Sequence, residues 1–330
     1  MENLPRLQIA HLPTAVEPLP RLSEALGGPT LLVKRDDQTG LAFGGNKTRK
    51  LEYLVADAQQ KGARTLITAG AVQSNHCRQT AAAAARLRFN CILVLTGEQP
   101  DQATGNLLLD RILGAEIVWA QRENRDQILR EVFEEAESAG RKPYLIPYGG
   151  SNPVGAVAYA FALQELLGQN IQPDYIVFAS SSGGTQAGLV AGARLFGFEG
   201  RVLGISVDEK AEVLQERVAA LANQTAEVLD LVTSFGPENI LVDDDYLGRG
   251  YGKMDEPEKE AIYLFAQKEG LLLDPVYTAR AAAGLISLIR KGFFQADQTV
   301  LFWHTGGTPA LFADQYQLPF YLSDFNPSTS

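Results

Sequence analysis

The stretch Phe43-Gly44-Gly45-Asn46-Lys47-Thr48-Arg49-Lys50-Leu51-Glu52-Tyr53-Leu54 joins two glycines to the start of a long amphipathic segment. Glycine lets the backbone approach another group closely, and asparagine is a favoured N-cap residue, so we expect a helix to begin near Asn46. Lys47 and Lys50 then lie three residues apart on one face of that helix. Two such lysines are also typical of a solvated basic turn. They oppose the helix dipole, however, which favours an anion beside them.

Short apolar runs alternate with helical patterns along most of the chain. The expected strands are Thr30–Lys34, Thr65–Thr68, Cys91–Leu95, Glu116–Trp119, Tyr144–Pro147, Tyr175–Ala179, Val202–Val207, Ile240–Val242 and Val300–Trp303. The expected helices include Asn46–Gln60, Asn75–Arg86, Asp126–Ala139, Val154–Leu167 and Glu256–Lys268. This alternation is typical of βαβ units, and strands rich in Ile, Val and Leu indicate sheets covered on both faces. The sequence therefore predicts the α/β class, with open twisted sheets, more than one in number, and helices on both faces.

Composition and charge narrow the class of protein. The chain has 330 residues, of which 45% are hydrophobic and 21% charged, as in a globular protein with a large core. A net charge of −10 without a basic stripe argues against binding to nucleic acid or to an anionic membrane. The sequence shows no apolar run of signal-peptide or membrane-span type, so we expect a cytoplasmic location.

Two further segments rich in glycine and hydroxyl side chains follow expected strands. They are Gly70-Ala71-Val72-Gln73-Ser74-Asn75-His76 and Ser180-Ser181-Ser182-Gly183-Gly184-Thr185-Gln186-Ala187-Gly188. In open α/β sheets, ligands bind in such turns beyond the carboxyl ends of strands. Ser74 and Asn75 could hold a carboxylate, or could simply cap the next helix. The second segment predicts a phosphate cradle, although it is neither a Walker A loop nor a G-x-G-x-x-G loop.

The last two segments are Asp274-Pro275-Val276-Tyr277-Thr278 and His304-Thr305-Gly306-Gly307-Thr308-Pro309, the latter at the end of an expected strand. His304 by itself is typical of a structural histidine. The sequence contains no recognisable Ser/His/Asp set, no H-E-x-x-H motif and no clustered carboxylates, so neither a hydrolase nor a metal site is expected. Cys77 and Cys91 are too few for a disulfide framework and are expected as small core residues.

Together these segments resemble the fold-type II pyridoxal-phosphate enzymes, and among them the family of D-cysteine desulfhydrase and 1-aminocyclopropane-1-carboxylate deaminase. The resemblance runs from about Pro5 to Phe312 and is carried by G-G-N-K-x-R-K-L-E-[FY]-L, then G-A-x-Q-S-N-H, S-G-G-T-Q-A-G, D-P-V-Y-T and H-T-G-G-T-P-A-L-F-A. It implies a two-domain fold similar to the tryptophan synthase β subunit. Residues 1–49 and 165–330 would form a large cofactor-binding domain and residues 50–164 a small α/β domain, with the active site in the cleft between them. Family members are commonly homodimers, so the resemblance also implies a homodimer.

The same resemblance implies a role for individual residues. Lys47 would bind pyridoxal 5'-phosphate through an imine. The cofactor's phosphate would be held by Lys50, Ser182, Gly183, Gly184 and Thr185, and its ring by Asn75, Thr278 and Thr305. The carboxylate of a small amino-acid substrate would be bound by Ser74, Asn75 and His76. Catalysis would involve Lys47, Ser74, Tyr251 and Tyr277.

Two positions separate members of this family. Deaminases carry Glu directly after the tyrosine of D-P-V-Y and Leu between the His and Gly of the last motif, where this chain has Thr278 and Thr305. D-cysteine desulfhydrases have these threonines, and L-cysteate sulfo-lyases share them. We therefore expect an α,β-elimination that converts D-cysteine to pyruvate, ammonia and hydrogen sulfide. Elimination of sulfite from L-cysteate and cyclopropane ring opening are alternatives, and a non-catalytic binder of an anionic metabolite is the alternative from another class.

Overall fold

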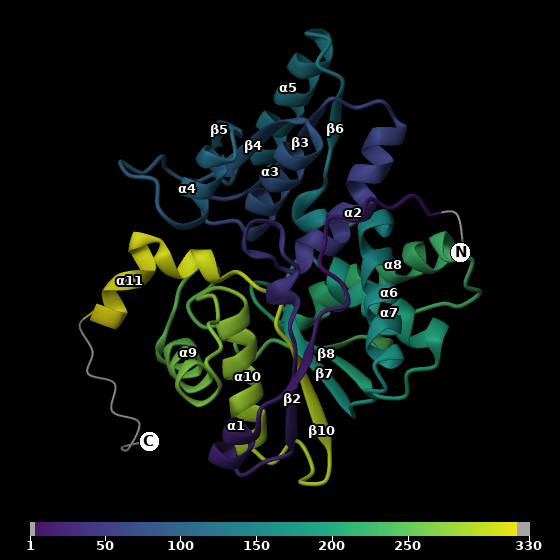
Figure 1. Cartoon of the computed structure of the whole chain (residues 1–330), viewed down its shortest axis with the longest axis vertical. Coiled ribbons are helices and arrows are strands. Elements are labelled where there is room, and N and C mark those ends of the chain that lie inside the picture. The colour runs from purple at the N-terminus through teal and green to yellow at the C-terminus, as the bar shows by residue number, and fades with distance from the viewer. Residues whose placement is uncertain (1–3, 322–330) are drawn as a thin grey trace.

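The structure is a computed structural model that describes residues 4–321 and contains two β-sheets with helices on both faces (Figure 1). The strands are β1 (Val16–Pro18), β2 (Thr30–Lys34), β3 (Thr65–Ala71), β4 (Asn90–Thr96), β5 (Glu116–Ala120), β6 (Pro143–Leu145), β7 (Tyr175–Ser180), β8 (Arg201–Ser206), β9 (Leu241–Asp243) and β10 (Thr299–Trp303). The helices are α1 (Pro20–Leu26), α2 (Asn46–Gln60), α3 (Asn75–Leu87), α4 (Gly105–Ile112), α5 (Arg125–Ser138), α6 (Pro153–Gly168), α7 (Gly184–Phe196), α8 (Ala211–Val228), α9 (Glu256–Glu269), α10 (Thr278–Arg290) and α11 (Asp314–Tyr321). The predicted α/β class is confirmed.

The larger sheet has six strands in the order β1-β2-β10-β7-β8-β9, all parallel except the edge strand β1. Successive side chains of a strand point to opposite faces of the sheet. In β7, Val177 therefore packs with α1, α9 and α10, whereas Ile176 and Phe178 pack with α6, α7 and α8. Because both faces are covered, these strands are apolar at nearly every position.

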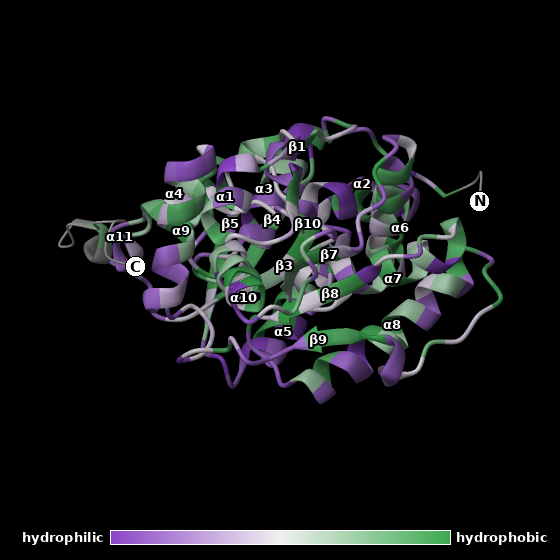
Figure 2. Cartoon of the chain, turned by 90° about the horizontal axis from the view of Figure 1, so that it is seen from below, coloured by the Kyte–Doolittle hydropathy of each residue, from purple (hydrophilic) through white to green (hydrophobic). Residues whose placement is uncertain are grey.

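The smaller sheet has four parallel strands in the order β5-β4-β3-β6, and it lies at the upper end of the molecule in Figure 1. Leu66 and Leu93 face α2 and α3, while Ile67 and Val94 face α5. Cys77 and Cys91 are both free thiols buried in the first of these two cores, which confirms the expectation for them. Figure 2 shows strands coloured mostly as hydrophobic, with hydrophilic turns on outer helices such as α9.

Most predicted elements are present, and the differences lie at their ends. The bounds of β2 and α2 are as expected, and the predicted strand Tyr144–Pro147 is shifted one to two residues toward the N-terminus, to Pro143–Leu145. Strand β1 was not predicted, because three residues are too short to show a pattern and its pairing with β2 is an edge contact. The predicted division into two domains at residues 49/50 and 164/165 stays a prediction.

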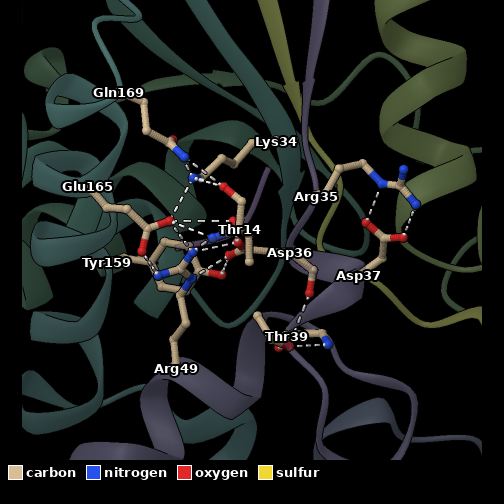
Figure 3. Close-up of polar contacts among 11 residues, drawn as sticks. Thr14, Lys34, Arg35, Asp36, Asp37, Thr39, Arg49, Tyr159, Glu165 and Gln169 are labelled. Carbon is tan, nitrogen blue, oxygen red and sulfur yellow. Dashed lines mark hydrogen bonds and ion pairs between the residues drawn. The ribbon is translucent and has the colours of Figure 1, made fainter. Parts of the chain in front are cut away.

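A buried ion cluster fixes the first half of α2 (Figure 3). The Arg49 guanidinium donates to both carboxylate oxygens of Asp36, at 2.8 and 2.9 Å, and to Glu165 at 2.9 and 3.0 Å. Lys34 Nζ donates to Glu165 at 2.6 Å, and the Tyr159 hydroxyl donates to Asp36 at 2.6 Å. Burial would raise the pKa of Asp36, but the charge of Arg49 and its hydrogen bonds hold that pKa below the usual value. The cluster thus joins β2, α2 and α6.

None of the helices within residues 4–321 is long and apolar enough to cross a membrane.

Candidate active site

A cavity lies where the carboxyl ends of strands from the two sheets meet. It is bordered by the segments that follow β3, β7 and β10, and by the first turn of α2. Its empty volume is about 620 Å³, a figure that includes space open to solvent. The lining includes most of the sequence-predicted site residues, namely Lys47, Ser74, Asn75, His76, Ser182, Gly183, Thr185, Tyr277 and Thr305.

The remaining predicted residues, Lys50, Gly184, Tyr251 and Thr278, lie behind the cavity wall or beside it. Lys50 is fully buried and lies against Gly184 in the glycine-rich turn. Tyr251 does not line the cavity but interacts with two residues that do, Tyr148 and Tyr277, and the hydroxyls of Tyr251 and Tyr277 are 2.6 Å apart. Thr278 is fully buried and bonded to Asp274. The structure therefore brings all four sequence motifs together, but not every side chain in them.

The first turn of α2 reaches the cavity because glycines let two backbones touch. Gly45 and Gly306 have φ values of +125° and +84°, in the left-handed region that favours glycine. A Cβ atom on Gly306 would lie 2.7 Å from the Gly45 Cα, and Asn46 N–H donates to Thr305 O at 2.9 Å. Helix α2 begins at Asn46 as expected, but Gly45 rather than Asn46 occupies the N-cap position. The Asn46 amide instead donates to the Thr185 hydroxyl at 3.0 Å.

Lys47 and Lys50 place two amines with lowered pKa values at or beside this cavity. Lys47 is half-buried and opens to the cavity, and burial lowers the pKa of its amine to about 8. The pKa of Lys50 is well below its usual value because of burial and, next, the charge of Lys47. Lys50 Nζ donates only to neutral oxygens, at 3.2 Å to Gly149 O and at 3.4 Å to Ser151 Oγ. Two buried amines without a carboxylate partner are costly as cations, and an anion between them would remove that cost.

The start of α7 forms the wall next to Lys50. Gly183 has a φ of +86°, and a Cβ atom on Gly184 would lie 2.5 Å from Ser151 Oγ and 2.9 Å from Lys50 Nζ. Ser151 Oγ accepts from Gly184 N–H at 3.1 Å and lies 2.7 Å from Ser182 Oγ. The first N–H groups of a helix have no intrahelical acceptor. Hydroxyl groups, a helix N-terminus and a lysine therefore converge here, which is the donor set that binds a phosphate.

His76 lines the cavity in a defined tautomer. The Thr68 hydroxyl donates to Ile146 O at 2.8 Å, so it must accept from His76 Nε2–H, which lies 3.0 Å away. Nδ1 consequently carries a lone pair, and in the described structure it has no partner. Burial, with the charges of Lys47 and Lys50, lowers the His76 pKa well below its usual value. The neutral ring can accept a hydrogen bond at Nδ1, a buried atom of a residue that lines the cavity.

Ser74 is the N-cap of α3, where its Oγ accepts from Cys77 N–H at 3.2 Å. The capping role weighed from the sequence is therefore confirmed, yet Ser74 also lines the cavity. Because Oγ acts as acceptor in the cap, its own O–H remains able to donate to a ligand. The N-terminal end of α3 adds a partial positive charge beside it. This corner of the cavity suits a carboxylate.

Three tyrosines, Tyr148, Tyr251 and Tyr277, form a hydroxyl-bearing wall at or beside the cavity. Burial raises the pKa of Tyr251 and Tyr277 well above the usual value, and it also raises that of Tyr148. All three phenols are protonated at neutral pH, so each can donate a hydrogen bond or a proton. Tyr148 and Tyr277 line the cavity directly.

Thr278 lies outside the cavity lining because the start of α10 is capped by an aspartate. Asp274 Oδ1 accepts from Thr278 N–H at 2.7 Å and from its hydroxyl at 2.8 Å, and Oδ2 accepts from Tyr277 N–H at 3.0 Å. These bonds turn the Thr278 side chain toward Asp274. Of the two threonines that separate family members, Thr305 alone is part of the wall.

The structure adds residues that the motifs did not include. Tyr148 and Gly149 line the cavity, and Ser151 connects Lys50, Ser182 and Gly184 as described above. They lie in a turn between β6 and α6 that is rich in glycine and hydroxyl groups, like the three turns recognised from the sequence. That shared composition was the available signal.

This donor set fits a cofactor that carries both an aldehyde and a phosphate. Lys47 offers an amine with a lowered pKa, and the cradle of Lys50, Ser182 and Gly184 offers phosphate ligands at a short distance along the same cavity. Within residues 4–321, no group of three or more His, Cys, Asp and Glu side chains is placed to hold a metal ion.

The chain belongs to the family of pyridoxal-phosphate-dependent enzymes, whose family model matches residues 7–306. Its cofactor is pyridoxal phosphate, as the sequence predicted. It is 42% identical over 322 residues to proteins named D-cysteine desulfhydrase from Klebsiella pneumoniae (strain 342) and from Yersinia enterocolitica serotype O:8, covering 95% of this chain and 97% of each relative.

Among solved structures, the chain is similar to a homologue of ACC deaminase. The TM-score is 0.89 and the identity 38%, and the match covers 97% of both chains. A hydrogen sulfide-producing enzyme from Fusobacterium nucleatum shares the fold, with a TM-score of 0.63 and 14% identity over 90% of this chain and 96% of that chain. The predicted resemblance to this family is confirmed.

Proposed function

We propose that the protein is a lyase that eliminates the thiol group of D-cysteine, with one water consumed and pyruvate, ammonia and hydrogen sulfide released. The observation that carries this proposal is the half-buried Lys47 amine, which opens into a cavity beside a phosphate cradle. The 42% identity to proteins named D-cysteine desulfhydrase over nearly the whole chain supports the choice of substrate.

The cofactor would be held at three points. Lys47 would bind its aldehyde carbon, and Lys50 with residues 182–185 would bind its phosphate. Asn75 and Thr305 would contact its ring from the walls formed by α3 and by the turn after β10. Thr278 would act on the ring only through Asp274, which its side chain faces.

The substrate would lie between the start of α3 and the tyrosine wall. Ser74 O–H and the α3 N-terminus would hold the carboxylate, and the His76 Nδ1 lone pair would accept from the amino group. When bound, pyridoxal phosphate supplies an electron sink that weakens the substrate's Cα–H bond. The Lys47 amine, neutral above a pKa of about 8, would remove that proton, and the Tyr277 phenol would donate to the departing sulfur.

A turnover panel tests the substrate. Purified holoenzyme would be supplied with D-cysteine, L-cysteine, L-cysteate, β-chloro-D-alanine and 1-aminocyclopropane-1-carboxylate, and pyruvate, ammonia, sulfide and sulfite would be measured. We expect pyruvate and sulfide from D-cysteine at the highest kcat/KM. Sulfite from L-cysteate as the main product, or turnover of the cyclopropane amino acid alone, would replace the proposal by that activity. Loss of optical purity without pyruvate would indicate a racemase.

Borohydride trapping tests the amine. Reduction of the holoenzyme followed by peptide mass analysis should place the cofactor adduct on Lys47. Lys47→Ala should show neither adduct nor turnover, whereas Lys61→Ala should show both, because Lys61 follows the last residue of α2 and its side chain is exposed. An unmodified Lys47 in wild-type protein would identify a non-catalytic binder and defeat the proposal.

We also infer a homodimer from the family resemblance, and a cytoplasmic location from the lack of any apolar run of signal-peptide or membrane-span type in the sequence. Sedimentation velocity of the holoenzyme checks the homodimer, since a single monomeric species at micromolar concentration would contradict it.

A further inference from the structure

The side-chain amide of Asn75 can present either its oxygen or its NH2 group to the cavity. The two orientations have opposite chemical meaning, because Oδ1 accepts hydrogen bonds and Nδ2 donates them. Asn75 is one of the residues that would contact the ring of the cofactor, where a ring oxygen needs a donor. The orientation of the Asn75 amide therefore decides whether the ring oxygen of the cofactor meets a donor or an acceptor.

A chain of hydrogen bonds on the far side of Asn75 determines that orientation. Asn106, in the first turn of α4, is fully buried, and its Nδ2 donates to Gln73 O at 2.9 Å. Gln73 O is a backbone carbonyl and can only accept, so the Asn106 amide is oriented without ambiguity. The same Nδ2 donates to Asn75 Oδ1 at 2.8 Å.

Two further bonds hold Gln73 itself in place. Asn106 N–H, which can only donate, bonds to Gln73 Oε1 at 2.8 Å, and Gln73 Nε2 donates to Thr104 O at 3.0 Å. Both amides are thus oriented by backbone groups of fixed polarity. Asn75 Oδ1 must face Asn106, and Asn75 Nδ2 must point the other way. Consistent with this, a Cβ atom on Gly307 would lie 2.6 Å from Asn75 Nδ2 and 2.7 Å from Asp274 Cβ, so Nδ2 points toward the turn after β10, whose Gly306 lines the cavity.

We propose that Asn106 is a positioning residue, which orients the amide of Asn75 by hydrogen bonding to its Oδ1 so that Nδ2 faces the cavity as a donor to the ring oxygen of the cofactor. This rests on the proposed function only in taking pyridoxal phosphate as the occupant of the cavity. No contact between Asn106 and the substrate is involved.

The proposal predicts a spectroscopic effect. A donor on the ring oxygen competes for the lone pairs that would otherwise hold the proton shared with the Lys47 nitrogen. Loss of the donor should therefore raise the pH at which the visible band of the bound cofactor titrates, by about one unit. Loss of one hydrogen bond to a charged oxygen should also weaken cofactor binding roughly 10-fold.

Asn106→Asp is the most informative substitution, because it keeps the shape and replaces the donor by an acceptor. A carboxylate at this position repels Asn75 Oδ1 and attracts Nδ2, so the Asn75 amide should turn over. Asn106→Ala removes the donor without adding charge and should shift the band in the same direction by less. Asn223→Asp is the matched control, since the Asn223 Nδ2 also donates to a backbone carbonyl, Phe235 O, but Asn223 lies on α8, outside the cavity lining.

A double-mutant cycle distinguishes positioning from a structural role. In an Asn75→Ala background, Asn106→Ala should produce no further change in the band or in the cofactor Kd, although its effect on thermal stability should remain. A band and titration identical to wild type in Asn106→Asp and Asn106→Ala would overturn the inference. So would an undiminished Asn106→Ala shift in the Asn75→Ala background.

The two proposals fail in different ways. Wild-type protein with a visible cofactor band but no D-cysteine turnover would defeat the proposed substrate and leave these measurements intact. Wild-type protein without a band would defeat both.

Discussion

The Lys47 amine should react with an aldehyde at a pH where an exposed lysine is almost fully protonated. Burial lowers its pKa from 10.5 to about 8. At pH 7 roughly one molecule in ten would then carry the neutral amine, against roughly one in 3000 for an exposed lysine, a ratio of roughly 300. Only the neutral amine attacks a carbonyl carbon, so the rate of cofactor attachment should rise by the same factor.

Stopped-flow reconstitution measures this directly. Apoenzyme would be mixed with pyridoxal phosphate between pH 6 and pH 10, and the second-order rate constant of the visible band would be divided by that for Nα-acetyl-lysine. Division cancels the ionisations of the cofactor itself. Below pH 8 the ratio should be constant, because both amines gain about tenfold in neutral form per pH unit. Above pH 8 it should fall, because the Lys47 amine is already neutral while the reference amine is not.

The result that would refute this reasoning is a ratio that stays constant up to pH 10. Lys47 would then have the pKa of an exposed lysine, and burial in the protein would not have lowered it. Lys61→Ala serves as the control and should give the wild-type profile, since that side chain is exposed.

Three further predictions concern the cradle, the tyrosine wall and the buried ion cluster. Gly184→Ala should raise the cofactor Kd roughly 10-fold or more in a fluorescence titration, because the new Cβ would displace Ser151 Oγ and Lys50 Nζ. Gly168→Ala, where nothing lies within 4 Å of the Cβ position, should leave the cofactor Kd unchanged, and equal Kd values for the two variants would contradict the phosphate cradle. Tyr277→Phe should lower kcat for D-cysteine by roughly 10² and Tyr251→Phe by less, because Tyr277 lines the cavity. Steady-state kinetics showing the reverse order would make Tyr251 the donor of the proton to the departing sulfur. Arg49→Met should destabilise the protein by about 3–5 kcal/mol, because it leaves Asp36 buried without its cation. Arg290→Met, at an exposed pair with Glu260, should cost about 1 kcal/mol or less, and similar losses of unfolding free energy for both variants in denaturant would contradict a stabilising role of the buried cluster.

Much of this fold and site follows from local sequence. The bounds of α2 and β2 were predicted without error, because helical and strand periodicity are properties of neighbouring residues. The segments after β3, β7 and β10 were recognised as parts of one site for a simple reason. Ligands bind at the carboxyl ends of strands in open α/β sheets, and the family resemblance assigned the turns of both sheets to one site. Lys47 was predicted as the cofactor-binding lysine from its motif and the family resemblance, and that role stays a prediction.

Other features were decided only by tertiary structure. The sequence could not show that the Thr278 side chain turns to Asp274, that Ser151 bonds to Ser182 from 31 residues away, or that Asn106 orients the amide of Asn75. Each depends on the direction in which a side chain points and on a partner distant in sequence, and periodicity carries neither. The sequence by itself determined the cofactor and most of the residues that line the cavity. The tertiary structure decided the burial that lowers the Lys47 pKa and the polarity of each hydrogen bond around it, because both depend on atoms that come together only when the chain has folded.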